Sequence, residues 1–154
     1  MAAVAPKPDL GVDPKRSALM ARIRSKGTQP ELVVRRALHA MGFRFRLHRR
    51  DLPGKPDIVL PKHRLVIFVH GCFWHQHPGC KLASSPKTGG DYWTPKLASN
   101  VARDERHARE LEAAGWRVET VWECDTRDVG RLRERIEMIC NGLSPLGAAA
   151  PSRR

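Results

Sequence analysis

Residues 56–70 read PDIVLPKHRLVIFVH, in which two short apolar runs flank the turn-forming residues PKHR at 61–64. Short apolar runs bounded by turn residues are typical of strands buried in the middle of a sheet. We therefore expect two adjacent central strands, over 57–60 and 65–69. Antiparallel pairing of these strands through the short turn would bring Asp57 close to His70.

The periodicity of apolar residues on either side predicts further helices and strands. Helical spacing predicts helices over 14–25, 29–41, 94–114 and 129–140, and two-residue alternation predicts strands over 43–47 and 116–122. Residues 71–92 are rich in Gly, Pro and Ser, which indicates an irregular loop. This order of elements predicts an α/β fold with one central sheet flanked by helices.

Length and composition indicate one intracellular domain. The chain has 154 residues, of which 41% are hydrophobic, and no apolar run approaches the ~18 residues that cross a membrane. The N-terminus has no cationic start followed by an apolar stretch, so we expect no secretory signal. Ends rich in Ala, Pro and Ser predict disorder over 1–13 and 142–154, which leaves 14–141 as the domain. These features argue against a membrane or secreted protein and favour a cytoplasmic location.

Charge favours a nucleic-acid partner. Lys and Arg number 28 against 16 acidic residues, so the formal net charge is +12. The excess is concentrated between Pro14 and Arg50, where eleven basic residues accompany one acid, Glu31. A concentrated positive surface attracts polyanions, and nucleic acid is the most common of these.

Three soft metal ligands lie close together in the predicted loop, namely Cys72, His77 and Cys80. Two thiolates and an imidazole, completed by a fourth ligand, form a donor set that zinc takes in structural sites. Cys124 follows the last predicted strand and could be the fourth ligand, with His70 or His75 as the alternative to it. Unlinked free thiols are the alternative to a metal site. Cys140 falls on the apolar face of the last predicted helix and is interpreted as core.

Four acid–base residues are candidates for catalysis, namely Asp57, His70, His75 and Glu31. A carboxylate at the end of a strand is a typical anchor for Mg²⁺, although Asp57 also fits a simple turn. Imidazole titrates near neutrality, so His70 or His75 could remove a proton from water. Glu31 lies three residues after Thr28, where a helix-capping role is sufficient to explain it. An acid among so many positive charges could instead belong to a metal–water network.

Large aromatic side chains in or near the same polar loop are Phe73, Trp74 and Trp93. Apolar side chains on a DNA-binding surface can enter the base stack and separate neighbouring base pairs. We favour this interpretation for Phe73 and Trp74, whereas Trp93 is equally well explained as core. Trp116 and Trp122 lie in a predicted strand and are interpreted as packing.

Two segments carry a family resemblance, and they read GKPDIVLPKHRLVIFVHGCFWHQHPGC at 54–80 and YWTPKLASNVARDERHARELEAAGWRVETVWEC at 92–124. They closely resemble the very-short-patch repair endonucleases, which are bacterial T:G mismatch nicking enzymes of the PD-(D/E)XK nuclease superfamily. The similarity spans Lys15 to Ile139, nearly the whole domain. It implies a single restriction-endonuclease-like domain with a mixed central sheet and a zinc-stapled loop.

The resemblance implies a role for each candidate. Asp57 looks like the family's Mg²⁺-binding aspartate, with the backbone carbonyl of Val69 as companion ligand, and His75 looks like the general base. His70 stands where most of the superfamily has a lysine, and Glu31 matches a glutamate of the N-terminal helix. The residues that match structural zinc ligands are Cys72, His77, Cys80 and Cys124. Those that match intercalating aromatic residues are Phe73, Trp74 and Trp93. Asp104 falls on a family acid, without an assigned role.

The sequence departs from the family pattern in its basic N-terminal extension, in the stretch Gly89–Gly90, in the loop at 75–80 and at residue 69. The loop HQHPGC at 75–80 is one residue longer, and Val69 replaces a threonine. The threonine is replaced without consequence if only the backbone carbonyl binds the cation.

The resemblance implies a Mg²⁺-dependent endonuclease with structural Zn²⁺ that nicks duplex DNA 5′ of the thymine in a T:G mismatch and so initiates very-short-patch repair. It also implies a monomer in the bacterial cytoplasm, associated with the nucleoid, and MutL-type mismatch-repair factors as partners. A zinc-stapled DNA-binding module without catalysis is the alternative from another class. Within the enzyme class, the alternative is a related nuclease that prefers a different mismatch or site.

Overall fold

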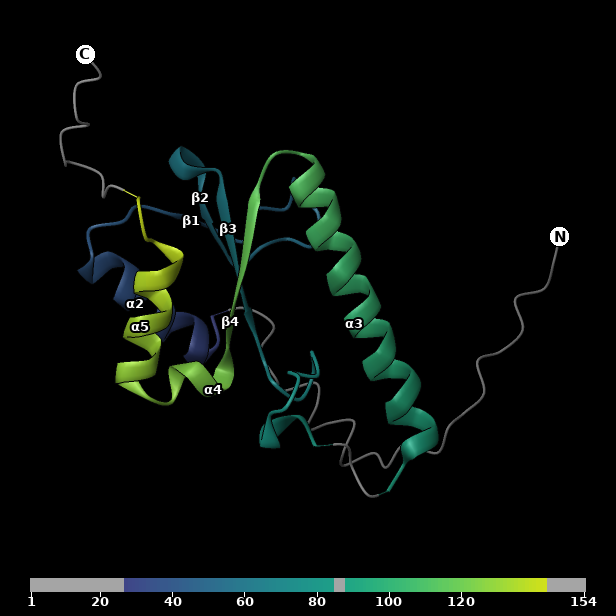
Figure 1. The fold of residues 1–154 in the computed structure, drawn as a ribbon. Helices are drawn as coiled ribbons and strands as arrows, with labels where there is room; N and C mark the ends of the chain where they lie inside the picture. The colour runs from purple at the N-terminus through teal and green to yellow at the C-terminus, as the bar shows by residue number, and fades with distance from the viewer. Residues whose placement is uncertain (1–26, 85–87, 144–154) are drawn as a thin grey trace, which may run out of the picture.

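A four-stranded sheet with helices on both faces forms the described part of the chain (Figure 1). The structure is a computed structural model and describes residues 27–84 and 88–143. Its helices are α2 (Gln29–Ala40), α3 (Gly90–Ala113), α4 (Glu123–Thr126) and α5 (Val129–Ile139). Its strands are β1 (Arg46–Leu47), β2 (Ile58–Leu60), β3 (Leu65–His70) and β4 (Arg117–Trp122). The helix predicted over 14–25 and the disorder predicted over 1–13 lie outside the described residues, as does the predicted disordered tail apart from 142 and 143.

The sheet is mixed and has the strand order β1-β2-β3-β4. Strands β2 and β3 are antiparallel, with Ile58 opposite Ile67, and a turn of 3-10 helix (Pro61–His63) joins them. Strands β3 and β4 are parallel, with Val69 opposite Val121. A parallel pair needs a long crossover connection, which here contains α3. The predicted α/β class, the mixed sheet and the antiparallel central pair are therefore confirmed.

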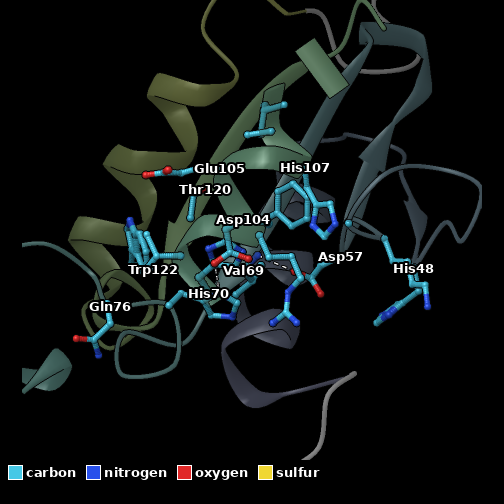
Figure 2. A pocket seen from close by; sticks show the side chains of 18 of the residues that line it. His48, Asp57, Val69, His70, Gln76, Asp104, Glu105, His107, Thr120 and Trp122 are labelled. Atoms are coloured by element: carbon cyan, nitrogen blue, oxygen red, sulfur yellow. Dashed lines mark hydrogen bonds and ion pairs between the residues drawn. The ribbon is translucent and has the colours of Figure 1, made fainter. Parts of the chain in front are cut away.

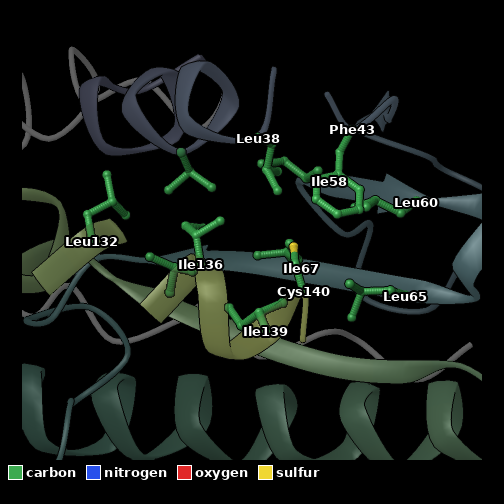
Figure 3. Close-up of a cluster of buried hydrophobic side chains, with 12 residues drawn as sticks. Leu38, Phe43, Ile58, Leu60, Leu65, Ile67, Leu132, Ile136, Ile139 and Cys140 are labelled. Atoms are coloured by element: carbon green, nitrogen blue, oxygen red, sulfur yellow. The ribbon is translucent and has the colours of Figure 1, made fainter. Parts of the chain in front are cut away.

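Strand periodicity divides the apolar side chains between two cores. In the first core, α2 and α5 pack on the sheet (Figure 3), and its strand residues are Ile58, Leu60, Leu65, Ile67 and Val121. The second core, on the α3 side, consists of Val59, Val66, Phe68, Leu111 and Trp116. Cys140 lies in the first core, as predicted. Residues two apart share a face of a strand, so Asp57 and His70 lie on the α3 side with Val59 and Phe68.

Two predicted boundaries are wrong. Of the strand predicted over 43–47, only Arg46 and Leu47 join the sheet. Their partner strand ends at Leu60, because Pro61 has no N–H to donate and starts the 3-10 turn.

The second wrong boundary is the start of α3, which begins at Gly90 instead of Thr94 and keeps Pro95 inside the helix. Trp93 therefore lies in this helix, and its side chain is 3% exposed. Its ring packs edge-to-face against Phe73 and Trp74, with centroids 5.4 and 5.8 Å away. This packing gives the early turns of the helix an apolar contact that local sequence does not reveal.

Candidate active site

A cleft of about 640 Å³ opens where β2 begins and where β3 and β4 end. Its polar lining includes Asp57 before β2, His70 at the end of β3, His75 in the following loop and Asp104 on α3. In the view of Figure 2, Asp57 lies between His48 on one side and His70 and Asp104 on the other. Three of the four predicted catalytic residues therefore line one cleft.

Asp57 is positioned by the backbone of the neighbouring strand. Its Oδ2 accepts a hydrogen bond from the N–H of Val69 at 2.8 Å, so the pairing of β2 with β3 fixes the carboxylate. Burial raises the pKa of Asp57 to about 6, the hydrogen bond from Val69 lowers it, and the charge of Glu31 raises it further. A bound cation would compensate for the lost solvation of this carboxylate. Asp57 therefore fits a divalent cation.

His70 and His75 stack face to face, with ring centroids 3.8 Å apart and planes inclined by 5°. Nδ1 of His75 lies 2.5 Å from Oδ2 of Asp104. Burial opposes the ionisation of Asp104, but the hydrogen bond and charge of His75 outweigh it and lower the pKa of Asp104. Burial, followed by the charge of His75, lowers the pKa of His70 to about 3. Near neutral pH, His70 is therefore a neutral imidazole, whereas His75 is paired with a carboxylate.

Asp104 is a site residue that had no assigned role in the sequence analysis. The inward face predicted for its helix contains Leu97, Val101, Ala108 and Leu111. Asp104 falls at the vacant helical step of that stripe, three residues after Val101 and four before Ala108. An acid on the apolar face of a helix is costly unless it is paired. The position of Asp104 on this face was therefore the feature of the sequence that could have indicated a buried partner.

Glu31 is 1% exposed and lies close to Asp57. Its N–H donates to Thr28 Oγ1 at 3.4 Å, so the predicted helix cap is present. The Glu31 carboxylate accepts from Gly27, Arg35 and His48 instead of closing the capping box on Thr28. Helix capping accounts for the hydrogen bond of the Glu31 backbone N–H, but it does not account for the burial of the charged side chain. Neither Arg35 nor His48 was singled out from the sequence, where both look like part of a basic surface.

Three cysteines and one histidine form a second cluster, and their ligand atoms all lie within 4.8 Å of one another: Cys72, His77, Cys80 and Cys124. Nδ1 of His77 lies 3.4 Å from the Cys124 sulfur, and its ring stacks on Trp122 with centroids 4.3 Å apart. Burial raises the pKa of the Cys72 thiol to about 12, and a bound metal ion would displace that proton. The donor set fits a closed tetrahedral zinc site. His70 and His75 lie in a separate group with Asp104.

Phe73, Trp74 and Trp93 form one aromatic cluster, with neighbouring ring centroids 5.2 to 5.8 Å apart. Phe73 and Trp74 are partly exposed, whereas Trp93 is buried. Asn100 of α3 donates a hydrogen bond to the Trp74 carbonyl at 3.0 Å, which ties the loop to the helix. Two rings are thus accessible from solvent, and the third supports them.

The chain is similar to known DNA nucleases in sequence and in fold. Residues 8–81 match the family model of DNA mismatch endonuclease Vsr. The chain is 55% identical to the Type II nicking enzyme V.XorIIP of Xanthomonas oryzae pv. oryzae over 81% of this chain and 91% of that protein. It is 41% identical to DNA mismatch endonuclease Vsr of Escherichia coli over 77% of this chain and 76% of that protein. The catalytic domain of homing endonuclease I-Bth0305I has a similar structure, with a TM-score of 0.50 and 22% identity over 74% of this chain and 95% of that one.

The mixed sheet, the cleft at its strand ends and this structural similarity define a domain of the restriction-endonuclease-like fold. Within that class, the chain belongs to the DNA mismatch endonuclease Vsr family. It is therefore a DNA endonuclease, and the family resemblance found in the sequence is confirmed. Across 27–84 and 88–143, no helix has the length and apolar character needed to span a bilayer.

Proposed function

We propose that this endonuclease nicks one strand of duplex DNA 5′ of the thymine in a T:G mismatch, and so initiates very-short-patch repair. One observation carries the chemical part of the proposal: a buried carboxylate, Asp57, shares a cleft with an imidazole–acid pair, His75 and Asp104. The names of the relatives, a mismatch endonuclease and nicking enzymes, support the choice of substrate and the cutting of one strand.

Each of the residues Asp57, His75 and His70 in the cleft would have a separate role in the reaction. Asp57 would hold Mg²⁺ together with the backbone carbonyl of Val69. When bound, Mg²⁺ neutralises charge on the scissile phosphate and lowers the pKa of a bound water. Because Nδ1 of His75 faces Asp104, Nε2 is the ring atom left to accept a proton from the attacking water. Neutral His70 can donate a hydrogen bond to a phosphate oxygen. The products of the cut would be a 5′-phosphate and a 3′-hydroxyl.

The loop between β3 and α3 would supply stability and mismatch recognition. Zn²⁺ at Cys72, His77, Cys80 and Cys124 would be structural, since protein ligands fill all four positions. The rings that would enter the base stack are Phe73 and Trp74, whereas the predicted third ring, Trp93, is buried and would support them. Weaker pairing at a mismatch lowers the cost of unstacking, which favours entry at that site.

The family context extends the proposal to the cell. The relatives are bacterial proteins, one of them named a mismatch endonuclease. On that basis, the protein would act as a monomer in the cytoplasm, near the nucleoid, with MutL-type factors as partners.

A nicking assay tests the proposed function. Labelled duplexes, matched or carrying T:G, are incubated with wild-type protein in Mg²⁺ or in EDTA, beside Asp57→Ala. Asp51→Ala is the matched control, because Asp51 is an exposed carboxylate in the preceding loop. We expect cutting of the thymine strand alone, in Mg²⁺ alone, by wild type and Asp51→Ala but not by Asp57→Ala.

Two other outcomes would replace the proposal. Tight binding without cutting of any duplex would leave a zinc-stapled DNA-binding module. Cutting of a different mismatch, or of a matched site, in a wider panel of duplexes would indicate a site-specific nicking enzyme with another preference, in line with the names of several relatives.

A further inference from the structure

The buried carboxylate of Glu31 is held by two side chains that the proposed mechanism does not use. Its Oε1 lies 2.5 Å from Nη2 of Arg35 and 2.6 Å from Nε2 of His48. Its Oε2 accepts the N–H of Gly27 at 2.9 Å. Because a buried charge without partners is costly, these contacts determine where the carboxylate can lie.

His48 reaches Glu31 from an unfavourable backbone conformation. Its φ is +49°, in the left-handed region that residues with large side chains adopt only at a cost. Its N–H donates to the backbone carbonyl of Asp57 at 3.2 Å. His48 therefore contacts Asp57 through its backbone and Glu31 through its ring. Strain of this kind beside a cleft is typical of a residue with a functional role.

Glu31, His48 and Asp57 have ligand atoms within 4.8 Å of one another, as a metal site would. The contacts that Glu31 already makes argue against a metal ion coordinated by Glu31, His48 and Asp57 together. A carboxylate oxygen has two lone pairs, and Oε1 of Glu31 already faces nitrogen atoms of Arg35 and His48. The guanidinium of Arg35 also supplies positive charge at this point. The group is better described as an ion network that balances the charge of Glu31 next to Asp57.

We propose that His48 and Arg35 are positioning residues of the nuclease. Both contact Oε1 of Glu31 and so fix its carboxylate, which leaves only Oε2 with a lone pair for a water near Asp57. Glu31 would then orient that water without binding the cation directly. The balanced charge also allows two carboxylates to lie near each other. This inference rests on the proposed function, because it assigns His48 a role relative to the cation at Asp57.

The kinetic test uses His48→Asn, because Asn tolerates the left-handed conformation but is too short to replace the imidazole contact. We expect the single-turnover nicking rate at saturating DNA to fall by roughly 10- to 100-fold, as for residues that orient metal-site groups. DNA affinity should stay close to that of wild type, and the thermal unfolding midpoint should fall only modestly, because Arg35 and Gly27 still bind the Glu31 carboxylate. His63→Asn is the matched control: His63 lies at the opposite end of β2 and β3, against Phe43, and the rate should not change.

A second variant and a spectrum separate positioning from simple packing. Arg35→Lys keeps the charge but loses the guanidinium geometry, so it should reduce the rate less than His48→Asn does. In long-range ¹H–¹⁵N spectra of the metal-free protein without DNA, His48 should carry a proton on Nε2 that is hydrogen-bonded to Glu31. Glu31→Gln should shift this resonance.

The outcomes distinguish this inference from the proposed function. If wild type cuts no duplex, the proposed function fails. If wild type cuts T:G DNA and His48→Asn cuts it equally fast, only the inference fails. The inference also fails if Nε2 of His48 carries no proton, or if Glu31→Gln leaves the His48 resonances unchanged.

Discussion

His75 and Asp104 are 29 positions apart in the sequence, yet Nδ1 of the first lies 2.5 Å from Oδ2 of the second. The contact joins the loop after β3 to the middle of α3 across the cleft. A carboxylate in this position fixes both the orientation and the tautomer of an imidazole, so that the far nitrogen can take a proton. The pair also explains an acid in the inward stripe of α3.

Asp104→Asn should slow nicking by roughly 10²- to 10⁴-fold, because the amide cannot stabilise the imidazolium that forms on proton transfer. DNA affinity should change little, because Asp104 faces His75. Single-turnover rates and a binding titration would measure both effects. Glu112→Gln, an exposed acid further along α3 and outside the cleft, is the control and should cut at the wild-type rate. An Asp104→Asn enzyme with full activity would exclude His75 as a base oriented by this acid.

Asp57→Asn should abolish cutting and yet stabilise the metal-free protein. Burial raises the pKa of Asp57 to about 6, so the folded state holds this proton more tightly than the unfolded chain does. Wild type therefore loses stability as pH rises from about 4 to about 6, by about 3 kcal/mol once the group is ionised. An uncharged Asn avoids this loss and can still accept the N–H of Val69.

Urea unfolding in EDTA across this pH range would measure the effect. The gain of Asp57→Asn over wild type should vanish below about pH 4, where Asp57 is protonated in both states. Glu112→Gln, on the exposed surface of α3, should follow wild type throughout. A variant less stable than wild type at about pH 7.5 would contradict a destabilising buried charge.

Purified protein should contain about one zinc ion per chain, and Cys124→Ser should lose it. Elemental analysis after gel filtration measures the content, and the thermal midpoint should fall with the metal because the loop loses its anchor. Cys140→Ala is the control: Cys140 packs in the first core, so this variant should keep zinc while losing some stability. Equal zinc content in wild type and Cys124→Ser would remove Cys124 from the ligand set.

Gly54→Ala should destabilise the fold by roughly 2–5 kcal/mol, from a strained backbone and overpacking. Gly54 has a φ of +73°, and an added Cβ would lie 2.8 to 2.9 Å from atoms of the His107 side chain. Gly142→Ala has a similar φ of +81° with no atom within 4 Å, so it should cost only about 1–2 kcal/mol. Urea unfolding of both variants compares the two costs; equal losses would show that His107 yields to the new methyl group.

Local features of the sequence predicted most of the fold. The apolar runs of 57–60 and 65–69 predicted the central strands, since burial on both faces requires continuous apolar residues. The helix predicted over 129–140 agrees with α5 to within one residue, because its apolar face and its length depend on neighbours in the sequence. The early start of α3 was missed, because Trp93 is packed against rings from a distant loop.

The candidate residues could be found in the sequence, because it shows their chemical type and spacing: Asp57, His70, His75, Glu31 and the Cys–His set. Which of these side chains contact one another depends on the tertiary structure. It placed Cys124 with His77 and kept His70 and His75 apart from them, paired Asp104 with His75, and brought His48 and Arg35 onto Glu31. The physical reason is that periodicity records which face of an element is buried, whereas contacts between side chains depend on how separate elements pack.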